Sequence, residues 1–314
     1  MQKNKLWVLG LSLVVSMILF MTLNANGQWD FVLPFRGEKL VALLAVAYAI
    51  SVSTILFQTL TANQILTPYI MGFDTLYLLI QTCLVFVLGG AAYAGLGGYI
   101  KFSIEVVCML IAAILLFSSL FMKSQTDLYR LILTGVILGV LFRSANGFLQ
   151  RIIDPEEFSV VQSASFAQFN IIKTALLYPS LVSILLVSVI IWRFRHVLDV
   201  LSLGKEQAIN LGIDYRKTIM LILFLIAVLV SVSTALVGPV TFFGLLVSGM
   251  TYTIFRTYQH SILIPAAFLI GATNLILGQV IFEHLIGFKG VLSVVIEFIG
   301  GIVFIMFLLK RRAL

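Results

Sequence analysis

Long apolar runs separated by short polar segments make up most of the chain. A helix needs roughly 20 mostly apolar residues to cross the hydrocarbon layer of a bilayer. On that scale the pattern predicts ten transmembrane segments, at residues 6–23, 40–60, 69–89, 104–122, 128–149, 171–192, 218–238, 241–256, 261–282 and 290–309. The runs do not alternate as barrel strands do, and a helix satisfies its own backbone hydrogen bonds in lipid. The pattern therefore predicts an all-α integral membrane protein with about ten transmembrane helices.

The first apolar run follows Lys3 and Lys5, which is also how a secretory signal begins. No small-residue cleavage motif comes after it, because residues 24–27 read Asn-Ala-Asn-Gly. The run is also long enough to span the bilayer. We therefore expect it to be the first transmembrane helix.

The basic residues between the runs predict the orientation. An even number of spans places both termini on one side, and cytoplasmic loops carry the excess of Lys and Arg. With cytoplasmic termini, the inner side receives the larger basic set: Lys3, Lys5, Lys123, Arg130, Arg193, Arg195, Lys205, Arg216, Lys217, Arg256, Lys310, Arg311 and Arg312. The outer side receives the smaller set: Arg36, Lys39, Lys101, Arg151, Lys173 and Lys289. The bias predicts a multi-pass protein of the cell (cytoplasmic or inner) membrane with both termini in the cytoplasm.

Composition excludes a soluble domain. Hydrophobic residues make up 61% of the chain and charged residues 11%, against about 25% charged residues in ordinary soluble domains. The net charge of +7 could suggest nucleic acid, but the basic residues form no patch with interleaved aromatic side chains. We therefore expect the lipid bilayer, and no nucleic acid, as the partner of this surface.

The longest polar segment on the inner side covers residues 193–217. Its middle, from Ser202 to Leu211, is compatible with a helix, and Gly204 and Gly212 are natural helix breaks. Apolar residues alternate with charged ones along it, so the segment either lies on the membrane surface or offers its apolar side chains to a partner. On the opposite side, residues 153–170 form an outer loop with the main exposed acidic feature.

Four motifs in this order resemble the FecCD-type permeases, which import siderophores, haem and cobalamin. They are residues 34–40 (PFRGEKL), 53–77 (STILFQTLTANQILTPYIMGFDTLY), 201–213 (LSLGKEQAINLGI) and 235–247 (ALVGPVTFFGLLV). The resemblance covers residues 34 to 310. It implies one transmembrane permease domain over residues 1–314, with a fold like that of the cobalamin-importer permease, in an ATP-binding-cassette importer of an iron–siderophore complex.

Some positions depart from the family pattern. Ser248 and Gly249 stand where the family has Pro-His, and the late Leu-Pro-x-Gly motif is absent near residues 290–293. Residues 247–260 are more similar to a branch associated with catecholate siderophores and petrobactin. The resemblance therefore favours a substrate of the catecholate or petrobactin type.

The family resemblance also implies partner subunits. The chain contains no G-x-x-x-x-G-K-[ST] phosphate loop, so it is not itself the ATPase. The resemblance makes it a transmembrane transport subunit and not an enzyme. The resemblance makes the inner segment, about residues 198–215, the coupling segment for ATP-binding-cassette ATPase subunits, in the form of two short helices. The coupling residues that it implies are Leu201, Leu203, Gly204, Lys205, Glu206, Ala208, Leu211 and Gly212. Leu203, Ala208 and Leu211 would supply the apolar contact.

On the outer side, the resemblance makes Arg36 and Lys39 docking points for an extracytoplasmic substrate-binding protein. The alternative is that both side chains simply extend to the membrane interface. Glu283 stands near a position where many relatives carry a further arginine. The resemblance also implies a second permease chain, either identical to this one or related to it.

Asp74, Arg143 and Glu297 are ionisable residues inside predicted spans. A charge at the bilayer centre costs at least about 2.5–3.5 kcal/mol, so such residues face a bundle interior or a wet cavity. Arg143, Asn146 and Gln150 give the fifth span a polar stripe, which we predict to line the translocation path at the dimer axis. The alternative is an intramolecular ion pair, or an arginine that extends to the interface.

The remaining chemistry is sparse. His196, His260 and His284 are scattered along the chain, so we predict no metal site and no cofactor, and we expect surface or interfacial histidines. The alternative function is a secondary transporter driven by an ion gradient. That function predicts inverted repeats and paired acids at mid-membrane, and the sequence shows neither clearly. A membrane-embedded enzyme would need a catalytic cluster, which is also missing.

Overall fold

The computed structural model describes residues 2–24, 27, 29–121, 128–164, 166–169 and 174–284, and scattered residues between 292 and 306. The described part is built from α-helices and one 3-10 turn, and it contains no strand. The all-α prediction is therefore confirmed for this part of the chain. The tenth predicted span, with Glu297, falls mostly outside the described residues.

The helices follow one another along the chain with short connections. The first half contains α1 (Gln2–Thr22), α2 (Trp29–Thr61), the 3-10 turn η1 (Pro68–Met71), α3 (Phe73–Leu88), α4 (Gly90–Gly95), α5 (Gly98–Phe121) and α6 (Leu128–Ile152). The second half contains α7 (Pro155–Ala164), α8 (Thr174–Arg193), α9 (Arg195–Leu201), α10 (Lys205–Asn210), α11 (Tyr215–Val237), α12 (Phe243–Ile254) and α13 (His260–His284).

Seven described helices are long and apolar enough to cross a membrane: α1, α2, α5, α6, α8, α11 and α13. The helices α3 and α12 coincide with two further predicted spans, but they contain only 16 and 12 residues. Nine of the ten predicted spans thus correspond to described helices. The helix α2 is longer than predicted, because it begins at Trp29 and carries Pro34 in its second turn.

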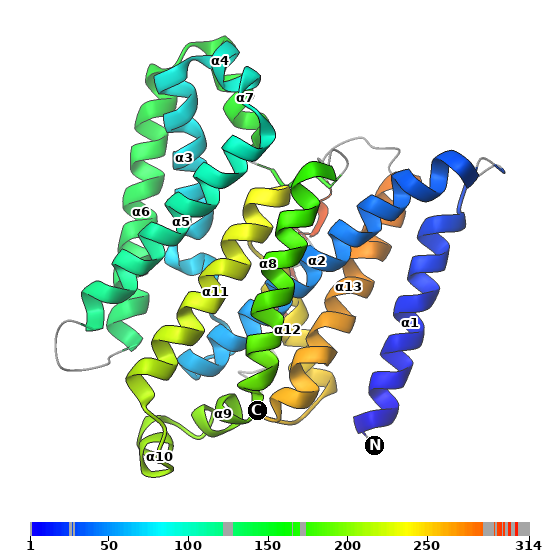
Figure 1. Ribbon diagram of the computed structural model, residues 1–314, viewed down its shortest axis with the longest axis vertical. Helices are drawn as coiled ribbons and strands as arrows, with labels where there is room; N and C mark the ends of the chain where they lie inside the picture. Colours follow the sequence, from blue (N-terminus) through cyan, green and yellow to red (C-terminus); the bar gives the residue numbers. More distant parts are fainter. Residues whose placement is uncertain are drawn as a thin grey trace.

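The two ends of the molecule differ in structure. Figure 1 shows the start of α1 at the same end as α9 and α10, while α4 and α7 lie at the opposite end. This agrees with the predicted orientation, in which the N-terminus and the coupling segment are both cytoplasmic. The end with α9 and α10 is called the inner end below, and the other the outer end.

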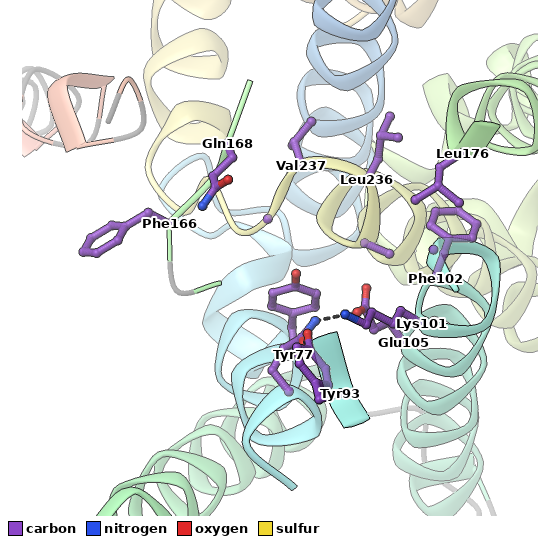
Figure 2. A pocket seen from close by; sticks show the side chains of 14 residues that line it. Tyr77, Tyr93, Lys101, Phe102, Glu105, Phe166, Gln168, Leu176, Leu236 and Val237 are labelled. Carbon is purple, nitrogen blue, oxygen red and sulfur yellow. Dashed lines mark hydrogen bonds between the residues drawn. The ribbon is translucent and has the colours of Figure 1, made fainter. Parts of the chain in front are cut away.

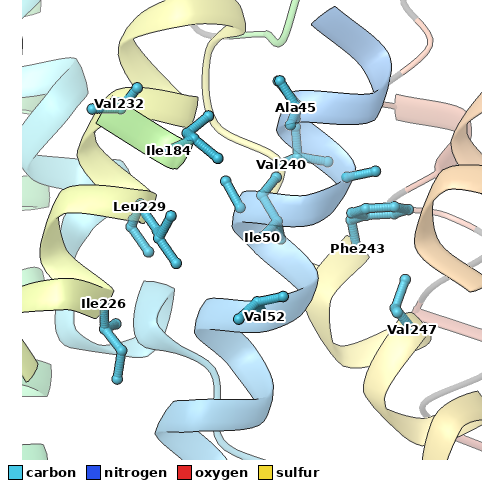
Figure 3. Close-up of a cluster of buried hydrophobic side chains, with 14 of the residues drawn as sticks. Ala45, Ile50, Val52, Ile184, Ile226, Leu229, Val232, Val240, Phe243 and Val247 are labelled. Atoms are coloured by element: carbon cyan, nitrogen blue, oxygen red, sulfur yellow. The ribbon is translucent and has the colours of Figure 1, made fainter. Parts of the chain in front are cut away.

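The core lies where α2, α8, α11 and α12 meet, and its side chains are almost entirely aliphatic or aromatic. Figure 3 shows this packing, with side chains that include Ala45, Ile50, Val52, Ile184, Ile226, Leu229, Val232, Phe243 and Val247. Lipid tails are as apolar as these side chains, so close van der Waals contact holds the helices together more than the hydrophobic effect does. Small residues permit that contact. Gly244 lies against Thr54, and Gly271 lies against Ser51, with no room for a Cβ atom.

The helical structure is interrupted between α2 and α3. Residues 62–67 leave the helix, η1 turns back, and Gly72 adopts φ of +87° before α3 begins. A left-handed conformation of this kind favours glycine. A Cβ on Gly72 would stand 2.6 Å from the Cα of Gly139 on α6. The absence of a side chain therefore lets the broken segment pack directly on α6.

The segment predicted as an outer loop contains a helix, so that prediction was wrong for residues 155–164. Pro155 occupies the first position of α7, where its missing N–H costs no hydrogen bond. Glu156 and Glu157 follow in the first turn, where the helix dipole favours negative charge. Glu157 also accepts a hydrogen bond from the backbone N–H of Gly90 at 2.8 Å, which ties α7 to the start of α4.

Candidate functional site

The predicted coupling segment consists of two short helices, α9 and α10, joined by a sharp turn. Gly204 begins this turn into α10 with φ of +103°, and Gly212 follows α10 with φ of +84°. Both values lie in the left-handed region, which residues with a Cβ rarely adopt. The predicted glycine breaks and the two-helix form are thus confirmed.

Burial divides the predicted coupling residues into two groups. Leu201 is buried against the rest of the chain, and Ala208 has no exposed surface at all. Leu203 and Leu211 are exposed, at 58% and 63%, and Ile209 is exposed beside them. The prediction that Ala208 supplies contact to a partner was therefore wrong, because α10 turns that residue inward. Lys205 and Glu206 are also exposed, at the start of α10.

Asp214 connects the coupling segment to α11. Its carboxylate accepts a hydrogen bond from the backbone N–H of Lys217 at 3.2 Å, as an N-cap residue does. The ammonium of Lys217 lies 2.9 Å from the other carboxylate oxygen. The hydrogen bond from Lys217 lowers the pKa of Asp214, so the cap remains charged near neutral pH.

A hollow of about 380 Å³ lies between η1, α3, α6 and the loop before α12. Its polar lining includes Tyr69, Asp74, Arg143 and Thr241. We call it the Arg143 hollow. Tyr69 is buried, and its hydroxyl lies 3.2 Å from the hydroxyl of Thr234 on α11. The broken segment η1 therefore forms one wall of the hollow and contacts the core at the same time.

The three residues of the predicted polar stripe do not share one environment. Arg143 is exposed and lines the hollow, whereas Asn146 is 8% exposed and accepts a hydrogen bond from Thr82 of α3 at 2.6 Å. Gln150 is half-buried nearer the outer end and does not line the hollow. Within the described residues, the stripe thus contributes one charged side chain, Arg143, to this hollow.

The two predicted docking residues at the outer end are engaged within the chain. Lys39 is 6% exposed and forms an ion pair with Glu283 of α13, so its assignment to an exposed docking surface was wrong. Arg36 is half-buried, and its guanidinium donates to the backbone carbonyls of Phe20 and Leu23 at 2.8 and 2.7 Å. Those carbonyls lie at the C-terminal end of α1, where the last carbonyl groups of a helix have no hydrogen-bond partner within the helix. Arg36 therefore caps α1.

A second polar site, of about 280 Å³, lies between the first half of α3 and the outer ends of α5 and α11. Figure 2 shows its side chains, with Tyr77, Tyr93 and Glu105 gathered on one side. Gln81 donates to Glu105 and accepts from the hydroxyl of Tyr93, and the Lys101 ammonium lies 3.8 Å from the Tyr93 ring centre. Burial, together with the Glu105 carboxylate, raises the pKa of Tyr93 to about 12, so its hydroxyl stays a donor. This network joins the helices at the outer end.

Sequence reasoning missed the position of His260. It predicted a surface or interfacial histidine, but His260 is 1% exposed and bonded to Asp199 of α9 and Thr59 of α2. His196 is exposed as predicted. No group of three metal-ligating side chains occurs in the part of the chain that the structure describes.

The described residues form a helical membrane domain in which the helix is interrupted between α2 and α3 beside a polar hollow. Apolar side chains are exposed at its inner end. This combination is typical of a transport permease. The chain belongs to the FecCD transport family, which it matches over residues 6–310. Members of this family are multi-pass permeases of ABC importers in the cell membrane and are not enzymes. Membership therefore implies an ATPase partner and a substrate-binding partner.

Particular relatives place the chain further within the family. It is 44% identical to the petrobactin import system permease protein YclO of Bacillus subtilis, over 97% of this chain and 96% of that protein. It is 36% identical to the petrobactin import system permease protein FatC of Bacillus anthracis, over 89% of this chain and 79% of that protein. A metal-chelate type ABC transporter in an inward-facing conformation matches with a TM-score of 0.87 at 23% identity. The match covers 99% of this chain and 100% of that one, and it shows the fold alone.

Proposed function

We propose that this chain forms one half of the translocation pore of an ABC importer for iron–siderophore complexes, with catecholate complexes of the petrobactin type as substrate. The observation that carries the substrate class is its 44% identity to a petrobactin import permease along nearly the whole chain. The 36% identity to a second petrobactin permease supports the same class.

The ATPase subunit docks on the exposed side chains of the coupling segment. Leu203, Ile209 and Leu211 are each about half exposed or more, although they lie at the inner end, outside the long spans. Apolar side chains gathered on such a surface indicate a protein contact. Lys205 and Glu206 flank them and give the contact its register, because charge at a rim contributes specificity more than affinity.

A second permease chain covers the outward face of α6. This face exposes a band of large apolar side chains: Leu133, Ile137, Val140, Leu141 and Phe148. Lipid could cover them, but the exposed Arg143 on the same helix is costly in hydrocarbon. Two chains related by a twofold axis would enclose Arg143 in a path between them. A siderophore complex is large and polar, so a path between two facing hollows suits the cargo better than one hollow alone.

The substrate-binding protein docks at the outer end, opposite the coupling segment. Of the two residues that the sequence indicated, only Arg36 is still accessible, because Lys39 is buried in its ion pair. We keep Arg36 as a contact with that protein. Exposed ion pairs contribute about 0–1 kcal/mol each, so Arg36 would orient the partner more than hold it.

Uptake measurements test this function directly. Cells that lack their own ferric uptake receive the chain with its partner subunits, and radioactive iron is supplied as petrobactin, enterobactin-like triscatecholate or hydroxamate complexes. We expect petrobactin uptake that disappears when the ATPase subunit is inactivated. Petrobactin uptake that persists without the ATPase and stops with an ionophore would instead support the ion-gradient transporter. Uptake of the hydroxamate alone would refute the substrate class.

A further inference from the structure

Asp199 on α9 reaches out of the coupling segment to the start of α13. One of its carboxylate oxygens, Oδ1, accepts from the backbone N–H of His260 at 2.7 Å. The same oxygen lies 2.8 Å from the ring Nδ1 of His260, which must donate because the carboxylate can only accept. A residue 61 positions away thus caps the N-terminus of a transmembrane helix.

His260 carries this connection onward to α2. Its side chain is 1% exposed, and its Nε2 lies 2.8 Å from the hydroxyl of Thr59. Thr59 belongs to the last turns of α2, two residues before that helix ends. The coupling segment, α13 and α2 are therefore joined by one continuous set of hydrogen bonds, which we call the Asp199–His260–Thr59 link.

The hydrogen bonds of the link fix the position of α9 relative to α13 more strictly than apolar contact does. Leu198 and Leu201 also anchor α9, but aliphatic side chains can slide past one another without losing much contact. Two bonds to a single oxygen at a helix N-terminus fix the position of α9, and a carboxylate is favoured there by the helix dipole. The Asp199 side chain is 28% exposed, so solvent screens the link only in part.

The helix α2 leads from the link to the hollow. It continues through residues 62–67 into η1, whose Tyr69 lines the Arg143 hollow and lies beside Thr234. A displacement of α9 would therefore reach a wall of the hollow through covalent chain and hydrogen bonds. Such a contiguous path is a physical basis for coupling between distant sites.

We propose that Asp199 and His260 are positioning residues for transport, which fix the coupling segment to α13 and α2 so that its movement reaches the hollow. This proposal rests on the proposed function, because it takes the exposed side chains of Leu203, Ile209 and Leu211 as the ATPase contact. It assigns to the link neither ATPase binding nor contact with the substrate.

Two measurements on Asp199→Ala test the link, with Asp199→Asn as the conservative variant and His196→Gln as the control. His196 lies 3.7 Å from the other carboxylate oxygen of Asp199 and is exposed, so its loss leaves the link intact. The first measurement uses the complete importer in proteoliposomes. It gives the ratio of iron taken up from ferric petrobactin to ATP hydrolysed. Hydrogen exchange of the purified permease gives the protection of the His260 amide.

In Asp199→Ala we expect about tenfold less uptake per ATP, within the usual range of coupling between sites. The His260 amide should exchange about tenfold faster, as expected on loss of a charged acceptor. Asp199→Asn, which keeps a neutral acceptor, should fall between Asp199→Ala and wild type, and His196→Gln should match wild type. A merely structural role would reduce the amount of assembled importer and leave uptake per ATP unchanged.

An unchanged ratio in assembled Asp199→Ala importer, or unchanged exchange at His260, would overturn the link. If the ATPase subunit is lost from purified Asp199→Ala, Asp199 belongs to the subunit contact. That result would also reject its proposed role as a positioning residue. Wild-type vesicles that take up no ferric chelate would instead refute the proposed function. Hydrogen exchange on the permease would still decide the link in that case, because it needs neither substrate nor ATPase.

Discussion

Lys39 of α2 and Glu283 of α13 form an ion pair in which the two side chains are only 7% and 8% exposed. Glu283 also accepts a hydrogen bond from Gln279, one turn earlier on α13, at 2.7 Å. The pair joins two of the long helices near the outer end. It therefore accounts for a lysine at this position without any contact to a partner protein.

Removing one member of this pair should destabilise the protein. Glu283→Leu leaves the Lys39 ammonium buried without its carboxylate, and loss of one partner of a buried pair costs about 3–5 kcal/mol. We expect a clear fall in the thermal unfolding temperature of the purified protein in detergent. The double variant Lys39→Met with Glu283→Leu should recover most of that loss. If Glu283→Leu alone unfolds at the wild-type temperature, the ion pair contributes nothing to stability.

The contact between Gly72 and Gly139 predicts a second effect on stability. In Gly72→Ala the new Cβ would stand 2.6 Å from the Cα of Gly139, and the backbone φ is +87°. We expect a loss of more than about 1 kcal/mol, through strain and displacement of α3 from α6. Gly147→Ala on α6 is the matched control, since its Cβ would meet nothing within 4 Å. Equal unfolding temperatures for the two variants would contradict the close approach.

The exposed apolar side chains of the coupling segment predict the effect of a charge. Leu211→Glu should abolish co-purification of the ATPase subunit and leave the permease folded, because Leu211 is 63% exposed. A charge without a partner in a subunit contact loses the apolar contribution and adds a desolvation cost. Leu211→Met keeps the apolar character and should bind normally. Normal ATPase binding by Leu211→Glu would remove this residue from the contact.

Arg143 predicts a loss of transport without a loss of assembly. A ferric complex of catecholate and carboxylate ligands carries net negative charge, so a cation in the path would favour its passage. We expect Arg143→Ala to reduce petrobactin uptake about tenfold, while Arg143→Lys keeps part of it. ATPase co-purification should be unchanged in both. Uptake at the wild-type rate in assembled Arg143→Ala would exclude Arg143 from the path.

Local composition accounts for the features that the sequence predicted well. A run of apolar residues specifies a membrane helix wherever it stands, so nine predicted spans coincide with described helices. The helix breaks at Gly204 and Gly212 are also set by local sequence, because a positive φ disfavours every residue type with a side chain at that one position. The two glycine breaks could therefore be predicted from the residues alone, whereas the division into two short helices was implied by the family resemblance.

Contacts between distant positions account for the errors. The partner of Lys39 is 244 residues away, and no local pattern distinguishes a buried lysine from an exposed one in the same place. Ala208 points inward because of how α10 packs on its neighbours, which depends on the turn at Gly204. His260 looked like an isolated polar residue at the start of an apolar run. Its role depends on Asp199, which only the fold brings to it.

The uncovered face of α6 has a consequence for the cell that makes this protein. In the pairing proposed above, a copy synthesised in excess of its partner would leave the apolar face of α6 and the exposed Arg143 without the protein contact that covers them. An unpaired copy would therefore be less stable than a paired one, because binding of a partner stabilises the folded state. Balanced stoichiometry, through co-translated genes or rapid pairing after insertion, would then set how much of this chain accumulates.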